Sequence, residues 1–230
     1  MKNVKTAALG MCMLTLVSGF TFTSCQTKQG TGTLIGAGGG AALGSIIGAI
    51  AGHGKGAAIG AAIGGAVGAG AGTLIGRHMD KVAAEAAQVE NAKVETVTDN
   101  NGLKAVKVTF DNGILFPLNK SELSSTSKTS LAKFSDVLKK NSDCYVDIYG
   151  YTDRSGGDGI NVPLSQKRAQ AVADYLTSCG VSSSQLKTIQ GKGSQDEIED
   201  KAVSQANRRV EVYLYASQQM VDAANNGTLK

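Results

Sequence analysis

Alternating apolar and polar residues predict five β-strands in the second half of the chain. A period of two is the pattern of a strand with one buried face. It runs through 94–98, 104–110, 144–149, 186–190 and 209–215. The residues Asp99-Asn100-Asn101-Gly102 separate the first two runs, and such a Gly-containing segment is typical of a hairpin turn.

Two longer segments between these strands have the spacing of amphipathic helices. Apolar residues recur every three or four positions within 121–140 and 164–178, and Gly180 follows the second segment as a typical C-cap. Strands that alternate with helices indicate an α/β fold, with helices packed on a sheet. The domain predicted at 94–215 is long enough to bury a core of ordinary size. The remaining segment, 216–230, is predicted as a C-terminal tail with an accessory helix.

Glycine recurs at every fourth position from Gly32 to Gly76. The segment 52–56 is the one polar interruption, and it divides two Gly/Ala/Ile stretches of about 20 residues, each about 30 Å long as a helix. Small residues on one ridge of a helix let two backbones pack closely. We therefore expect a glycine-zipper helical hairpin at 32–76, followed by a charged helical linker at 77–93.

Two alternatives stay open for this hairpin. Glycine destabilises a helix in water by about 1 kcal/mol per site relative to alanine, so lipid or a partner must supply the missing stability. The hairpin could lie in or on a membrane, or it could form a homo-oligomer without insertion. A flexible Gly/Ala linker is disfavoured because apolar residues such as Ile46, Ile47 and Ile63 lie between the glycines.

The first 24 residues have the organisation of a signal peptide. Lys2 and Lys5 precede an apolar stretch over 7–20, and small residues follow it. Cys25 stands directly after these small residues, which resembles a bacterial lipobox and predicts lipid attachment to its thiol, with 25–31 as a short spacer. An ordinary signal peptide that is cleaved nearby is the alternative.

The composition excludes several classes of function. Of 230 residues, 42% are hydrophobic, 30 are glycine and none is tryptophan, and the net charge is only +4. Since no basic block or aromatic–basic patch occurs, we expect no nucleic-acid binding. The two histidines, His53 and His78, both lie in the zipper region, so we expect no enzyme, no metal site and no cofactor.

Cys144 and Cys179 remain once Cys12 and Cys25 are assigned to the signal peptide and the lipid anchor. Cys144 begins a strand and Cys179 ends a helix on its apolar stripe, so both are expected to face one core. A disulfide between them and two buried free thiols are both compatible with this placement. We expect no histidine near either thiol, and therefore no catalytic cysteine.

The segment from Gly150 to Arg168 carries the clearest candidate chemistry. On a helix that begins at about Leu164, Arg168 falls within the apolar stripe, where a charge requires a partner or an anionic ligand. Asp153, at the end of the preceding strand, is the nearest candidate partner. A carboxylate and a guanidinium can also bind a zwitterion together, so a direct Asp153–Arg168 ion pair and a shared ligand are the two alternatives.

Three motifs in this region resemble the OmpA-like peptidoglycan-binding family. The central motif, roughly GHTDxxGxxxxNxxLSxxRAxxV, is matched by Gly150, Thr152, Asp153, Gly156, Asn161, Leu164, Ser165, Arg168, Ala169 and Val172. The flanking motifs are matched by Phe116-Pro117-Leu118-Asn119-Lys120 and by Asn207-Arg208-Arg209-Val210. The resemblance covers about 94–215 and implies a βαβαβ-type domain with helices packed on a mixed sheet.

The resemblance implies binding of peptidoglycan without catalysis. In that interpretation Asp153 holds the ammonium and Arg168 the carboxylate of the diaminopimelate in the peptide stem. Thr152, Asn119 and Asn161 are further ligand-binding residues that the resemblance implies. Either asparagine could instead cap a helix, and Asn161 is placed to do so ahead of a proline.

Two features of the motifs qualify this interpretation. The chain has Tyr151 where the family often has histidine and Ile160 where an aromatic residue is frequent, which leaves the charged pair intact but can alter ligand preference. Arg209 belongs to the third motif, and it could instead occupy the outer face of an edge strand.

Together these observations predict an outer-membrane lipoprotein. Its lipid and glycine hairpin would lie at the membrane, while the domain, in the periplasm, would bind peptidoglycan and tether the membrane to the cell wall. By resemblance to other bacterial lipoproteins, Gln26 after the lipidated cysteine fits outer-membrane sorting. The alternative function is a glycine-zipper oligomer that perturbs the membrane, with the wall-binding domain only positioning it.

Overall fold

The computed structural model describes residues 67–68, 70–111, 116 and 120–229. The predicted signal peptide, Cys25 and nearly all of the predicted glycine hairpin lie outside these residues, and so does Asn119. Among the helices that the structure describes, none is both long and apolar enough to cross a membrane.

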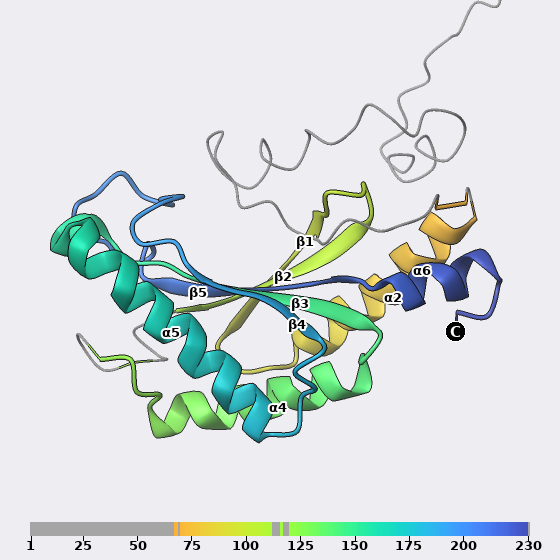
Figure 1. Cartoon of the computed structure of the whole chain (residues 1–230), viewed down its shortest axis with the longest axis horizontal. Coiled ribbons are helices and arrows are strands. Elements are labelled where there is room, and N and C mark those ends of the chain that lie inside the picture. Colours follow the sequence, from red (N-terminus) through yellow and green to blue (C-terminus); the bar gives the residue numbers. More distant parts are fainter. Residues whose placement is uncertain (1–66, 69, 112–115, 117–119, 230) are drawn as a thin grey trace, which may run out of the picture.

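A mixed five-stranded sheet lies at the centre of the domain (Figure 1). Its strands are β1 (Ala92–Thr98), β2 (Lys104–Asp111), β3 (Cys144–Gly150), β4 (Leu186–Gly191) and β5 (Arg209–Ala216). They lie in the order β1-β2-β5-β3-β4, and only the β3–β4 pair is parallel. The five predicted strands and the predicted α/β class are confirmed.

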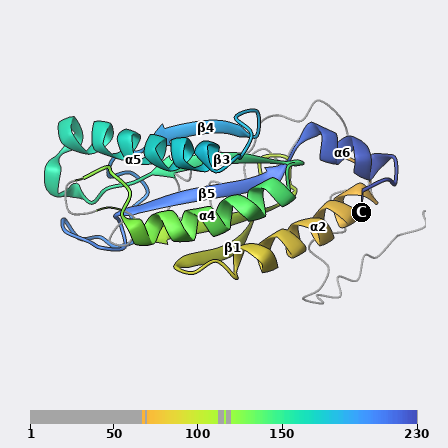
Figure 2. The same ribbon diagram turned by 90° about the horizontal axis from the view of Figure 1, so that it is seen from below.

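Helices cover one face of this sheet. They are α2 (Ala71–Ala86), α4 (Ser125–Lys140) and α5 (Asp158–Ser178), and in Figure 2, seen from below, they lie side by side in front of the strands. Their apolar stripes meet the inward residues of the strands in one continuous core, which includes Phe110, Phe134, Ile148, Val172 and Leu214. The edge-to-face contact of Phe110 with Phe134, at 5.4 Å between ring centroids, joins β2 to α4.

The end of the predicted zipper and the first part of the predicted linker form one helix of the domain, and the linker's last two residues, 92 and 93, already belong to β1. In α2, Ile75, Met79 and Val82 recur at helical spacing and are fully buried in the core. The helix begins at Ala71, so the predicted boundary between residues 76 and 77 falls inside it. The C-terminal helix α6 (Gln218–Asn225) packs against α2.

The opposite face of the sheet carries mainly tyrosines and charged residues, with Ala105 and Val97 among them. Tyr149, Tyr151, Tyr213 and Tyr215 alternate with core residues on β3, its continuation and β5, and all four are buried. Arg209 stacks on the ring of Tyr151 at 3.9 Å and pairs with Glu211 at 2.7 Å. The expectation that Arg209 could lie on an edge strand is wrong, because β5 is the central strand of the sheet.

Candidate binding site

The loop between β3 and α5 is shaped by hydrogen bonds within the chain. After Gly150 the backbone enters the short 3₁₀ helix η1 (Arg154–Gly156), and Gly157 then turns it with a positive φ of 64° into α5. Asn161 lies inside α5, and its side-chain amide donates to the carbonyl of Asp153 at 2.8 Å. The expectation that Asn161 caps a helix ahead of Pro163 is therefore wrong: α5 begins at Asp158 and contains the proline.

Two glycines let α5 pack directly on the ends of β3 and β4. A Cβ atom on Gly150 would lie 2.3 Å from the carbonyl oxygen of Ser165, and one on Gly191 would lie 2.2 Å from the amide nitrogen of Gln166. These distances are far below van der Waals contact, so a side chain at either position would force the helix away from the sheet. The close packing places Arg168, in the next turn of α5, near the end of β3.

Asp153 is buried and holds four hydrogen bonds. One carboxylate oxygen accepts from the hydroxyl and amide of Ser155, at 2.6 and 3.2 Å. The other accepts from Arg208 Nη1 at 2.6 Å and from the amide of Ser204 at 3.3 Å. Burial alone would raise the pKa of Asp153, but the hydrogen bonds from Ser155 and Arg208 outweigh it and hold the pKa below its ordinary value of 3.8.

Arg168 is also buried, but it is held differently. Its Nε donates to the carbonyl of Lys120 at 3.1 Å, and its guanidinium lies 5.3 Å from the centre of the Phe116 ring. Burial lowers the pKa of Arg168, and the nearby charge of Arg208 lowers it further, while Asp153 partly offsets both. Within the described part of the chain, no carboxylate lies within ion-pair distance of Arg168.

Asp153 therefore pairs with Arg208, and the alternative of a direct Asp153–Arg168 ion pair is not what the structure contains. Arg208 is brought there by the segment between β4 and β5. Asn207 fixes this segment by accepting from the amides of Ile198 and Glu199, at 2.8 and 3.0 Å. The site thus combines two guanidinium groups with one carboxylate, an excess of positive charge that suits an anionic group.

Sequence reasoning assigned no role in the site to Arg208. The Asn207-Arg208 motif was the available signal in the sequence, but the motif alone does not show which group Arg208 contacts. Of the other predicted site residues, Thr152 is buried, and within the described chain its hydroxyl has no hydrogen-bond partner. An orphan hydroxyl at the edge of this site is free to bind a ligand.

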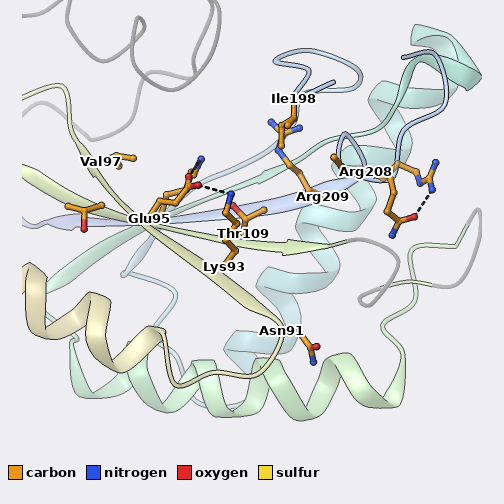
Figure 3. A pocket seen from close by; sticks show the side chains of 12 residues that line it. Asn91, Lys93, Glu95, Val97, Thr109, Ile198, Arg208 and Arg209 are labelled. Atoms are coloured by element: carbon orange, nitrogen blue, oxygen red, sulfur yellow. Dashed lines mark hydrogen bonds and ion pairs between the residues drawn. The ribbon is translucent and has the colours of Figure 1, made fainter. Parts of the chain in front are cut away.

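A groove of about 740 Å³ lies on the other side of Arg208. Figure 3 shows it between the β1–β2 hairpin and the segment that carries Ile198. Lys93 and Lys107 line it, and both pair with Glu95. Asp153 and Arg168 do not line this groove, so Arg208 is the residue that the groove shares with the charged site.

Comparison with known proteins places this domain in a family. Residues 115–211 match the model of the OmpA family, and residues 1–80 match that of the YMGG-like Gly-zipper. The chain carries an OmpA family domain. The resemblance given by the three sequence motifs is confirmed, and the family is a non-enzymatic one, in agreement with the predicted absence of catalysis.

Two curated relatives are similar to parts of this chain. The peptidoglycan-binding protein ArfA of Mycobacterium tuberculosis is 45% identical over 85 residues, which are 36% of this chain and 26% of ArfA. The probable lipoprotein YiaD of Escherichia coli is 33% identical over 149 residues, which are 61% of this chain and 64% of YiaD. The chain thus spans less than two thirds of either relative.

A solved structure with a similar fold is that of a putative MotB-like protein from Desulfovibrio vulgaris. It aligns with a TM-score of 0.50 and 22% identity, over 64% of this chain and 92% of that one. At this identity the similarity establishes the fold of the OmpA family domain and nothing further.

The cysteines of the OmpA family domain are free thiols. Cys144 is fully buried with its sulfur 3.9 Å from that of Met79 in α2, while Cys179 is the C-cap of α5, so the two do not form a disulfide. The expectation that no histidine lies near a thiol is wrong, because α2 brings His78 close to Cys144. Burial raises the pKa of Cys144 far above its ordinary value, which makes the thiol a poor nucleophile.

The ion pair at Asp153 gives a testable dependence of stability on pH. Asp153→Asn should lower the free energy of unfolding by about 1–3 kcal/mol at neutral pH, because Arg208 loses its anionic partner. The folded-state pKa of Asp153 lies below 3.8, so its charge stabilises the fold above that pH and ceases to do so as the pH falls through the folded value. The difference between variant and parent should therefore shrink below that pH.

Urea unfolding at a series of pH values measures this difference. Asp136→Asn is the matched control, because Asp136 is exposed on α4 and forms only a surface ion pair, with Lys139, so it should change stability little at any pH. A difference between Asp153→Asn and the parent that stays constant from neutral to strongly acidic pH would contradict the assignment.

Proposed function

We propose that the OmpA family domain binds peptidoglycan non-covalently through the diaminopimelate of its peptide stem. The observation that carries the proposal is a buried guanidinium, Arg168, that has no carboxylate partner among the described residues and lies next to a buried carboxylate, Asp153. A buried charge of this kind is costly unless an anionic ligand completes its environment. ArfA, which matches this region, is named as a peptidoglycan-binding protein.

Diaminopimelate offers the complementary groups. Its free end bears an ammonium and a carboxylate on one carbon atom, so the ammonium can bind Asp153 while the carboxylate binds the planar guanidinium of Arg168. In the structure the carboxylate of Asp153 already forms an ion pair with Arg208. The incoming ammonium must therefore share or displace Arg208, which can then turn toward the ligand's carboxylate.

Other residues have supporting roles in this proposal. Thr152 offers its buried hydroxyl to the ligand, and Asn161 holds the carbonyl of Asp153 and so keeps the carboxylate in place. Asn119 stays a predicted ligand-binding residue.

We further propose that the chain is a lipoprotein of the cell envelope that tethers the outer membrane to peptidoglycan. Cys25 would carry the lipid, and the glycine repeat would lie at the membrane. Support comes from the match of residues 1–80 to a glycine-zipper family and from the similarity to YiaD, which is named as a probable lipoprotein.

Sedimentation with purified cell walls tests the binding proposal. Full-length protein in detergent should pellet with diaminopimelate-type peptidoglycan, and Asp153→Ala and Arg168→Ala should each weaken binding at least tenfold, a loss of about 1.4 kcal/mol. Lys167→Ala is the matched control, because Lys167 is the exposed cationic neighbour of Arg168 on α5.

A second peptidoglycan makes this test specific. Lysine-type peptidoglycan lacks the second carboxylate of diaminopimelate, so the parent should prefer the diaminopimelate type and Arg168→Ala should lose that preference. Equal binding of both types by the parent, or full binding by folded Arg168→Ala, would overturn the proposed role of the pair.

The anchoring proposal has its own experiment. Cells grown with radioactive palmitate should label the parent protein, and Cys25→Ser should abolish the label and shift the protein out of the membrane fraction. Cys12→Ser, which alters the other cysteine of the N-terminal segment, should leave both unchanged. Persistent labelling of Cys25→Ser would show that the anchor lies elsewhere.

A further inference from the structure

A second cluster of chemically active side chains lies away from the charged site, where α2 meets the beginning of β3. His78 is on α2, Asp143 is in the turn after α4, and Cys144 is the first residue of β3. The imidazole Nε2 lies 3.5 Å from a carboxylate oxygen of Asp143. One ligand atom from each of the three residues lies within 4.8 Å of the other two.

The three side chains of this cluster differ in their exposure to solvent. Cys144 is fully buried, and its sulfur lies 3.9 Å from the thioether of Met79, which is also fully buried. The side chains of His78 and Asp143 are 15% and 27% exposed. The sulfur atoms thus form a closed base, and the imidazole and carboxylate form a rim through which an ion can enter.

We propose that His78, Asp143 and Cys144 form a binding site for zinc(II). Imidazole nitrogen, carboxylate oxygen and thiolate sulfur are the three ligand types that zinc uses in proteins. With bond lengths of about 2.0–2.3 Å, neighbouring ligands of a tetrahedral zinc lie roughly 3.3–3.8 Å apart. The observed spread of up to 4.8 Å can contract to that range by small side-chain rotations.

The coordination and the proton balance follow from these ligands. Three protein ligands leave a fourth position for water, which enters from the exposed rim. Binding breaks the S–H bond of Cys144, forms the S–Zn bond and releases the proton to solvent. Glu85, the other carboxylate whose charge acts on His78, is already held by Lys140 and by Asn141, the latter at 3.0 Å, so Asp143 is the available oxygen ligand.

The position of this site gives it a structural consequence. His78 belongs to the helix that continues directly from the glycine repeat, and Cys144 begins a strand of the sheet that carries Asp153 on its continuation. A zinc ion would therefore fasten the helix to the sheet independently of ligand binding at the charged site.

Cobalt(II) substitution tests the site, because cobalt replaces zinc in tetrahedral sites and its thiolate complexes absorb visibly. Titration of the full-length reduced protein in detergent with cobalt(II) should produce a thiolate-to-cobalt charge-transfer band that saturates at one equivalent, and zinc(II) should abolish it. Cys144→Ala should eliminate the band. His78→Ala and Asp143→Asn, which alter partly exposed side chains, should each weaken cobalt binding at least tenfold.

Cys179→Ser is the matched control, since Cys179 is the other free thiol of the domain, and it should bind cobalt like the parent. A parent without a thiolate charge-transfer band would overturn the proposal. A band that survives in folded Cys144→Ala, or that His78→Ala and Asp143→Asn leave unchanged, would also overturn it. Peptidoglycan sedimentation of the same variants is expected to be unchanged.

Discussion

The close packing of α5 on the ends of β3 and β4 is the constraint on which the charged site depends. Gly150 and Gly191 leave no room for a side chain between the strands and the backbone of Ser165 and Gln166. The same contact is reinforced by Ser165, whose hydroxyl accepts from the amide of Gly193 at 2.9 Å. Arg168 is buried near Asp153 because α5 lies this close to the strands. The site therefore depends on the packing of the backbone as well as on the identity of its side chains.

Electrostatics then determine what the site can accept. A buried carboxylate is stabilised by one guanidinium, and a second guanidinium is buried nearby with a backbone carbonyl and an aromatic ring as its neighbours. If a carboxylate of the protein neutralised this second charge, Arg168 would no longer be available to an anionic ligand. In the proposed binding mode, a carboxylate of the ligand would neutralise this charge, and Arg208 pairs with Asp153 when no ligand is bound.

Much of this architecture was predictable from local patterns. Period-two alternation located the five strands, and helical periodicity placed Arg168 inside an apolar stripe, where it is buried. The start of α5 was missed because a proline in the second turn was taken as the helix boundary, whereas α5 begins at Asp158 with Gly157 as its N-cap. Arg208 could be recognised as part of a motif, but its pairing with Asp153 depends on how the β4–β5 segment folds back.

Long-range packing accounts for the remaining differences. The helix α2 joins the core because Ile75, Met79 and Val82 pack against the sheet. The regular glycine spacing at its start indicated a separate zipper and gave no sign of this packing. The same packing brings His78 to Cys144, although the neighbouring Met79 and Cys144 are 65 positions apart in the chain. The buried tyrosines and the Arg209–Glu211 pair likewise follow from β5 being central, which strand patterns alone do not reveal.

A crystal structure of the domain with a diaminopimelate-containing muropeptide tests the central claim most directly. The account predicts that the free end of diaminopimelate places its ammonium within hydrogen-bonding distance of the Asp153 carboxylate and its carboxylate within hydrogen-bonding distance of the Arg168 guanidinium. A muropeptide bound in the groove of Lys93 and Lys107, with Arg168 untouched and Asp153 still held by Arg208 alone, would contradict it.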